Sequence, residues 1–70
     1  MMTLAQGTVN QTYVIRDVEA KDSMRDFLFT LGCYSGEKVT IISKLASNFI
    51  INVKDARYSI DEGLARVIMI

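Results

Sequence analysis

Cys33 is the only cysteine of the sequence, and hence its only thiol nucleophile and thiolate ligand, and histidine is absent. Histidine is the commonest general base and the commonest transition-metal ligand in proteins. No serine therefore has a histidine partner, and the glycines form neither a phosphate-binding loop nor a dinucleotide-binding fingerprint. The residue types predict that the chain is not an enzyme.

Metal binding by this chain would depend on Cys33 and on a group of carboxylates that cluster in the sequence. These are Asp17, Glu19, Asp22 and Asp26. Capping and solvated surface charges explain the carboxylates most simply, and a weak divalent-cation site is the alternative. A lone thiolate without histidine lacks the ligand set for tight zinc or iron binding. We therefore assign no metal ligands or certain cofactor, and keep weak binding of ferrous iron or another divalent transition metal as an alternative.

The balance of positive and negative side chains indicates which kinds of partner the chain could bind. Eight Lys and Arg residues offset eight Asp and Glu residues, so the formal net charge is zero. The basic residues are scattered, without a stripe of interleaved aromatics, which argues against nucleic-acid binding. A neutral surface resists self-association weakly, so a homodimer is compatible with the sequence, and an apolar C-terminal segment favours one.

Compartment and domain number follow from length and composition. A single cysteine fits a reducing environment, the N-terminal residues lack the pattern of a signal peptide, and no apolar run approaches ~20 residues. We expect a cytoplasmic protein that contacts a membrane only through its partner. Seventy residues, half of them hydrophobic, predict one domain over 1–70.

Residues 21–31 predict an amphipathic helix that ends at a glycine. Asp22 or Ser23 could cap it, and Ser23 with Asp26 resembles a capping box. The predicted apolar stripe consists of Met24, Phe27, Leu28 and Leu31. Phe29 lies about 150° from the centre of that stripe, at about 100° per residue. It is either covered by a loop or exposed as a partner contact, since exposed aromatics anchor interfaces.

Two glycines shape the corner that follows the helix. Gly32 takes the position after the last helical residue, where a positive φ favours glycine. Cys33 comes next and is expected to fold back onto the last turn as a small buried hydrophobe. Gly36 marks a second turn before the chain becomes extended.

Five segments predict strands, and they cover residues 13–18, 37–44, 48–54, 57–60 and 66–70. A short helical turn over 61–65, capped by Asp61, precedes the last of them. That last strand is apolar on both faces and should be central or covered. The fold class is mainly β: a small SH3-like barrel of about five strands with one α-helix and a short helical turn.

The sequence resembles the FeoA family, the small ferrous iron transport protein A. The family pattern is a helix ending Leu-Gly-Leu, then a variable residue, Pro-Gly and Val-x-Val or Val-x-Ile, and here Leu31-Gly32-Cys33-Tyr34-Ser35-Gly36 leads into Val39-Thr40-Ile41. The closing pattern is matched by Ile60 and by Ala65 to Ile70. Cys33 stands in place of a leucine and Ser35 in place of the turn proline. The resemblance extends over roughly Leu4 to Ile70 and implies an SH3-like barrel.

The resemblance also implies a function, which is that of a cytoplasmic accessory or regulatory protein of bacterial ferrous iron uptake. Such proteins are thought to act on the FeoB membrane transporter through its cytoplasmic GTPase region, and the family has no accepted catalytic residues. SH3-like barrels bind through surfaces between loops, so the partner-binding residues expected here are Phe29, Tyr34, Ser35, Lys38, Leu45 and Asn48. A small metal-sensing domain is the alternative function, and a nucleic-acid-binding barrel is a weaker one.

Overall fold

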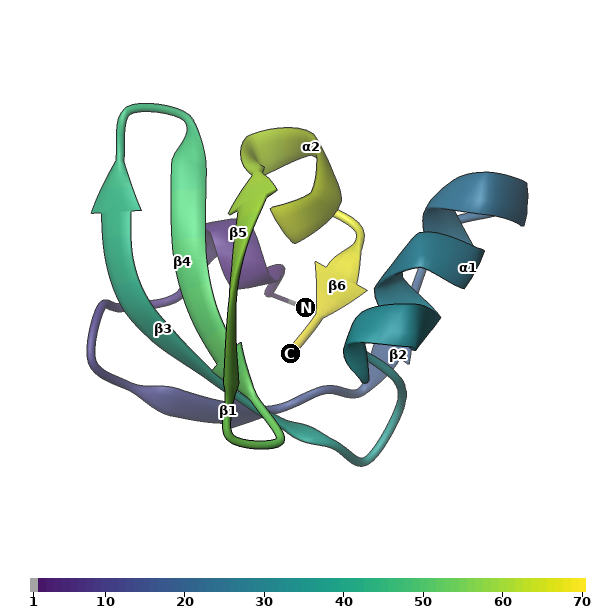
Figure 1. The fold of residues 1–70 in the computed structure, drawn as a ribbon, viewed down its shortest axis with the longest axis horizontal. Helices are drawn as coiled ribbons and strands as arrows, with labels where there is room; N and C mark the ends of the chain where they lie inside the picture. Colours follow the sequence, from purple (N-terminus) through teal and green to yellow (C-terminus); the bar gives the residue numbers. More distant parts are fainter. Residues whose placement is uncertain (1) are drawn as a thin grey trace.

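The computed structural model describes residues 2–70 as two antiparallel β-sheets with three short helical segments (Figure 1). The larger sheet has the strand order β1 (Thr12–Val14), β3 (Lys38–Leu45), β4 (Asn48–Val53) and β5 (Ala56–Asp61). The smaller sheet pairs β2 (Asp17–Val18) with β6 (Ile68–Met69). The helical segments are η1 (Leu4–Gln6), α1 (Asp22–Leu31) and α2 (Glu62–Ala65). The predicted mainly β architecture is confirmed, with six strands in place of about five.

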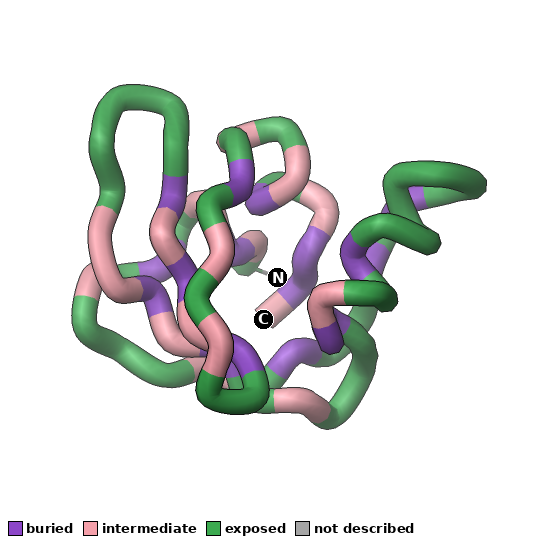
Figure 2. The backbone as a smooth tube through the Cα atoms, in the orientation of Figure 1, coloured by how far each residue is buried: buried purple, intermediate pink, exposed green. Residues whose placement is uncertain are grey.

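The hydrophobic core lies between the two sheets. Alternate residues of the long strands face it, among them Val39 and Ile41 on β3 and Ile51 and Val53 on β4. Period-2 alternation puts the intervening residues on the outer face, which explains why the buried positions in Figure 2 recur at every second residue along β4. The second sheet closes the core with Ile68, which is fully buried.

The single strand predicted over residues 13–18 is in fact two strands that belong to different sheets. The N–H of Ile15 donates to the carbonyl of Glu37 beside β3, over 2.8 Å. The N–H of Arg16 donates instead to the carbonyl of Met69 in β6, over 2.7 Å. The backbone therefore changes partner between adjacent residues, and Ile15 fills the core at that point. Alternation alone could not reveal this change, because both halves are extended.

The predicted cap of α1 was wrong. Lys21 occupies the N-cap position in an extended conformation, and it makes no side-chain capping hydrogen bond to the described residues. Asp22 enters the helix with φ of +55°, a left-handed conformation that aspartate tolerates better than most residues. Ser23 consequently lies inside the first turn rather than before it, and the capping box with Asp26 does not form.

The apolar stripe predicted for α1 is buried only at its C-terminal end. Leu28 is fully buried and Leu31 half-buried, whereas Met24 and Phe27 are 41% and 47% exposed. The physical reason is visible in Figure 1, where the N-terminal part of α1 projects beyond the barrel. The helix therefore presents apolar side chains that the domain itself does not cover.

The glycine corner after α1 is confirmed. Gly32 has φ of +96°, its N–H donates to the carbonyl of Phe29 over 3.0 Å, and the N–H of Cys33 donates to that of Leu28 over 2.9 Å. These two bonds form a Schellman motif that satisfies the last carbonyls of the helix. Gly36, with φ of +92°, occupies the second turn, which the Glu37 N–H closes on the Tyr34 carbonyl over 3.1 Å.

The C-terminal elements also follow the prediction. Asp61 caps α2, since its Oδ1 accepts a hydrogen bond from the N–H of Leu64 over 2.9 Å. Ile68 and Met69 of β6 are both buried, as a strand apolar on both faces requires. The apolar end is thus covered within the domain, and the homodimer that it favoured in the sequence stays a prediction. The sequence did not reveal η1, whose Leu4 is fully buried.

Candidate interaction surface

Phe29 and Tyr34 meet on the surface where α1 ends. Their ring centroids are 6.1 Å apart and their planes are inclined at 89°, an edge-to-face contact. The Schellman motif at Gly32 reverses the chain, so that Tyr34 returns alongside the last turn of the helix. The two rings are 39% and 38% exposed. The glycine corner therefore builds an exposed aromatic pair.

A cation lies over each of these two rings. The Arg25 guanidinium is 5.1 Å from the centroid of Phe29, one helical turn further along the chain, and the Lys54 ammonium is 5.2 Å from that of Tyr34. Lys54 also pairs with Glu37, with 3.0 Å between Nζ and Oε1. Such contacts hold long side chains over aromatic faces and fix their positions. We call Arg25, Phe29, Tyr34 and Lys54 the aromatic row.

Lys54 remains charged in this position. Hydrogen bonding to Tyr34, and then to Glu37, raises the pKa of Lys54 above its ordinary value. Its aliphatic stem passes close to Gly32, where an added Cβ would meet Cδ and Cε at 3.2 and 3.3 Å. Gly32 is therefore required both for its positive φ and for the path of the lysine side chain.

Phe27 is a second exposed phenylalanine of α1, but it lies away from the aromatic row. At about 100° per residue, Phe27 and Phe29 lie on opposite sides of Leu28, the residue that faces the core. The two phenylalanines therefore present separate surfaces of one helix. Only Phe29 contacts an aromatic ring within the described part of the chain.

The residues predicted for partner binding fall into two groups. Ser35 follows Tyr34 and is exposed, and its hydroxyl donates to the Arg16 carbonyl over 2.9 Å. Lys38 is exposed at the start of β3, opposite Val14 of β1. Leu45, which is 77% exposed, and Asn48 flank the β3–β4 turn, which Figure 1 shows on the far side of the molecule from α1. One contact of ordinary size would not cover both groups.

Cys33 is fully buried beneath the corner. Burial, and then the charge of Glu37, raises the pKa of its thiol to about 11. The expectation of a buried hydrophobe is confirmed. Within residues 2–70, no three side chains among Cys, Asp and Glu lie close enough together to hold a metal ion. The metal-sensing alternative stays a prediction, and no cluster of ligands among residues 2–70 supports it.

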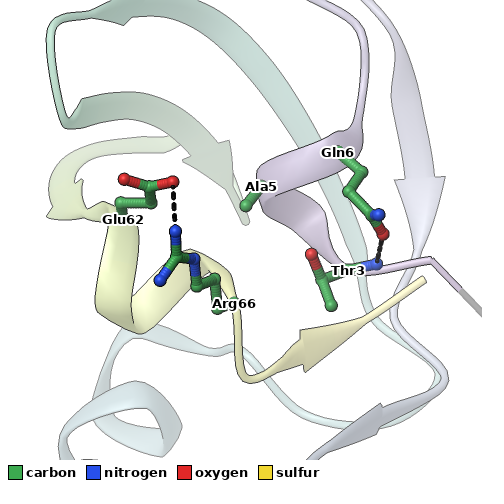
Figure 3. Close-up of a pocket in the computed structure, with 5 residues that line it drawn as sticks. All are labelled: Thr3, Ala5, Gln6, Glu62 and Arg66. Atoms are coloured by element: carbon green, nitrogen blue, oxygen red, sulfur yellow. Dashed lines mark hydrogen bonds and ion pairs between the residues drawn. The ribbon is translucent and has the colours of Figure 1, made fainter.

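A depression lies between η1 and α2 (Figure 3). It is lined by Thr3, Ala5, Gln6, Glu62 and Arg66. The Arg66 guanidinium pairs with the Glu62 carboxylate over 2.9 Å, and Gln6 Oε1 accepts a bond from the Thr3 N–H over 2.9 Å. Its charged groups neutralise one another, so we do not include it in the candidate surface.

Arg25 and Lys54 are the members of the aromatic row that sequence reasoning missed. The four-residue spacing of Arg25 and Phe29 on a helix was a signal that could have found the first contact. Nothing in the local sequence could have found the second, because Lys54 reaches Tyr34 from the β4–β5 turn.

None of the helices in residues 2–70 is both long and apolar enough to cross a bilayer.

A twisted four-stranded sheet closed by a short second sheet, with a helix inserted before β3, defines an SH3-like barrel. Comparison with known proteins gives the family. The sequence model of the FeoA domain matches residues 2–70, so this chain belongs to the FeoA family. No curated protein sequence matches the chain.

Solved structures support the same fold at low sequence identity. The chain is similar to an iron uptake regulatory protein, FeoA, with a TM-score of 0.86 and 20% identity over 94% of this chain and 88% of that one. It is also similar to Stenotrophomonas maltophilia FeoA, solved with zinc, with a TM-score of 0.87 and 23% identity over 99% and 88% of the chains. A manganese-dependent transcriptional repressor matches with a TM-score of 0.87 and 13% identity, over 96% of this chain but 39% of the repressor.

Proposed function

We propose that this chain is a cytoplasmic accessory protein of bacterial ferrous iron uptake that regulates FeoB by binding its cytoplasmic GTPase region. Membership of the FeoA family supports the pathway. A zinc-bound relative of the same fold is described as a candidate ferrous iron transport activating factor. The role on FeoB is that of an interaction module, since the residues of this chain offer no catalytic set.

The observation that carries the proposal is the aromatic row. Exposed aromatic side chains and arginine are the residues most often responsible for binding energy at protein interfaces. Phe29 and Tyr34 hold each other in place, and Arg25 and Lys54 lie over them. Ordering these side chains on binding therefore costs little entropy, which favours affinity. Arg25 forms no ion pair with the described residues, so its charge is free for a partner carboxylate.

The partner surface that fits this row is apolar at its centre and acidic at its rim. An acidic rim would meet Arg25 on one side and Lys54 on the other, with the two rings between them. Charge complementarity of this kind mainly raises association rates and fixes orientation. The binding of the GTPase region should therefore weaken as ionic strength rises.

An epistasis experiment in the source organism tests the pathway. Ferrous iron uptake is measured in strains that lack this chain, FeoB, or both. We expect loss of this chain to change uptake only where FeoB is present, with normal uptake restored by the wild-type gene. An equal change in the strain that lacks FeoB would contradict the proposal.

A further inference from the structure

The last strand of the larger sheet, β5, leaves one edge without a partner. It follows β4 through a two-residue turn, at Lys54 and Asp55, in which both residues have positive φ, +51° and +64°. Such turns place the flanking residues, here Val53 and Ala56, in a hydrogen-bonded pair. Hydrogen-bonded pairs then alternate along the hairpin, so Ala56, Tyr58 and Ile60 bond to β4.

The intervening residues therefore direct their backbone groups away from β4. These residues are Arg57, Ser59 and Asp61, and all three are exposed. No other strand pairs with this edge in the described structure, and the N–H groups of the three residues have no backbone acceptor within residues 2–70. An open edge of this kind is a template for another strand.

The side chains at this edge carry opposite charges in a symmetric arrangement. Arg57 and Asp61 lie two residues on either side of Ser59, on the same face of β5. When two copies of the strand run antiparallel with the two-fold axis at Ser59, Arg57 of each copy lies directly opposite Asp61 of the other. Opposite charges in directly facing positions stabilise a strand pair, whereas like charges destabilise it.

Other registers are less favourable. A two-fold axis at Arg57 would place two arginines opposite each other. An axis at Tyr58 would place Asp55 opposite Asp61. Among these three registers only the axis at Ser59 pairs opposite charges, so the charge pattern favours it over the other two. Neither Arg57 nor Asp61 forms an ion pair within the described chain.

We propose that the free edge of β5 is a homodimer interface, in which two copies of this chain pair antiparallel about Ser59. The pairing extends the sheet across the two-fold axis. The backbone groups of the two Ser59 residues bond to each other, and the N–H of Asp61 donates to the carbonyl of Arg57 in the other copy. An isologous contact of this kind closes on itself and stops at two copies. The interface is small, and interfaces well below about 1,200 Å² are weak, so the dimer should form at high protein concentration. The proposal is independent of the function proposed above, because β5 contributes no residue to the aromatic row.

Cysteine cross-linking tests the register directly. In Ser59→Cys the two thiols would face each other across a pair whose Cα atoms are about 5.5 Å apart, within the range of about 4.4–6.8 Å that a disulfide spans. Ser47→Cys, in the exposed β3–β4 turn, is the matched control. Cys33 is fully buried and contributes little background. We expect oxidised glutathione to cross-link the first variant at least about tenfold faster than the second.

Charge variants complete the test. Arg57→Glu, added to Ser59→Cys, would place two acids opposite each other and should reduce cross-linking to the rate of the Ser47→Cys control. Asp61→Asn keeps a capping side chain and should reduce the rate less. Circular dichroism would verify that each variant is folded. Equal rates for Ser59→Cys and Ser47→Cys, or no effect of Arg57→Glu, would overturn the proposal. Amide NMR gives a further outcome. If the β5 amides do not shift as the concentration of this chain rises, and shift only when the GTPase region is added, the proposal is also overturned.

Discussion

The ring of Phe29 lies edge to face against the ring of Tyr34, 6.1 Å away, across a glycine corner that both terminates the helix and starts the return to the sheet. This contact joins α1, the longest helix of the described structure, to the barrel surface. It fixes two side chains that a flexible helix end would leave mobile. The same contact that orders the corner therefore presents the candidate interaction surface.

Phe29→Ala should weaken binding to the GTPase region by at least about tenfold, because it removes the central ring of the aromatic row. The folded state should lose about 1 kcal/mol or less, since the ring is exposed and the lost stacking is small. Binding is measured by isothermal titration calorimetry and stability by urea unfolding. A loss of binding that merely follows a loss of folded protein would contradict the assigned role.

Phe27→Ala is the matched control for that variant. It removes a phenylalanine of similar exposure from the same helix, on the other side of Leu28. We expect binding within about twofold of wild type, because the aromatic row is intact.

Leu45→Ala examines the second group of predicted residues at the β3–β4 turn. A larger effect of Leu45→Ala than of Phe29→Ala would move the interface to that turn.

Gly32→Ala should destabilise the domain more than Gly36→Ala does. Both glycines have positive φ, which costs an alanine about 1–2 kcal/mol. A Cβ at Gly36 meets nothing within 4 Å, whereas one at Gly32 would lie 3.2 Å from Lys54 Cδ and 3.3 Å from the buried Val53 Cγ1. Urea unfolding of the two variants gives the difference. Adding Lys54→Ala should reduce the difference between the two variants without abolishing it, because Val53 Cγ1 also lies 3.3 Å from the added Cβ. An unchanged difference would show that Lys54 does not contribute to it.

Cys33 should react slowly with thiol reagents in the folded protein. Its pKa is raised from 9.0 to about 11, so the thiolate fraction at neutral pH is about 100-fold lower than that of an unperturbed thiol. Reaction with a thiol reagent in native buffer and in denaturant measures the ratio. Equal rates in the two conditions would show that the thiol is accessible.

The same shift gives a pH dependence of stability. The folded state binds the thiol proton more tightly than the unfolded state, so this contribution is complete below pH 9 and declines as the pH rises toward about 11. Cys33→Ala removes the titrating group and should make the free energy of unfolding less dependent on pH over this interval. Denaturant melts at several pH values check the sign.

Asp61→Ala should destabilise the domain by about 0.5–2 kcal/mol, because it removes the acceptor for the Leu64 N–H at the start of α2. Asp61→Asn keeps a capping oxygen and should cost less. Thermal unfolding compares the two variants. If both lose the same stability, the charge of Asp61 rather than its cap is what stabilises the turn.

Local patterns in the sequence predicted the elements whose structure depends on local chemistry. Gly32, Gly36 and Asp61 occupy the turns and the cap that their residue types favour. The errors lie at positions where residues distant in the sequence determine the local structure. The strand over 13–18 divides because Ile15 donates to Glu37 beside β3 whereas Arg16 donates to Met69 in β6. The stripe of α1 is half exposed because the barrel covers only one end of the helix. Lys54 joins the aromatic row through a long-range contact that no local pattern encodes.

The most direct test of the proposed function is an amide NMR titration of the labelled chain with the GTPase region of FeoB from the same organism. We predict that shifts cluster at Arg25, Phe29, Tyr34 and Lys54, and that Phe29→Ala requires at least about tenfold more of the GTPase region to produce them. The β3–β4 turn, which lies on the far side of the molecule, should remain unperturbed. The absence of any shift at saturating concentrations of the GTPase region, or shifts confined to Leu45 and Asn48, would contradict an interaction through the aromatic row.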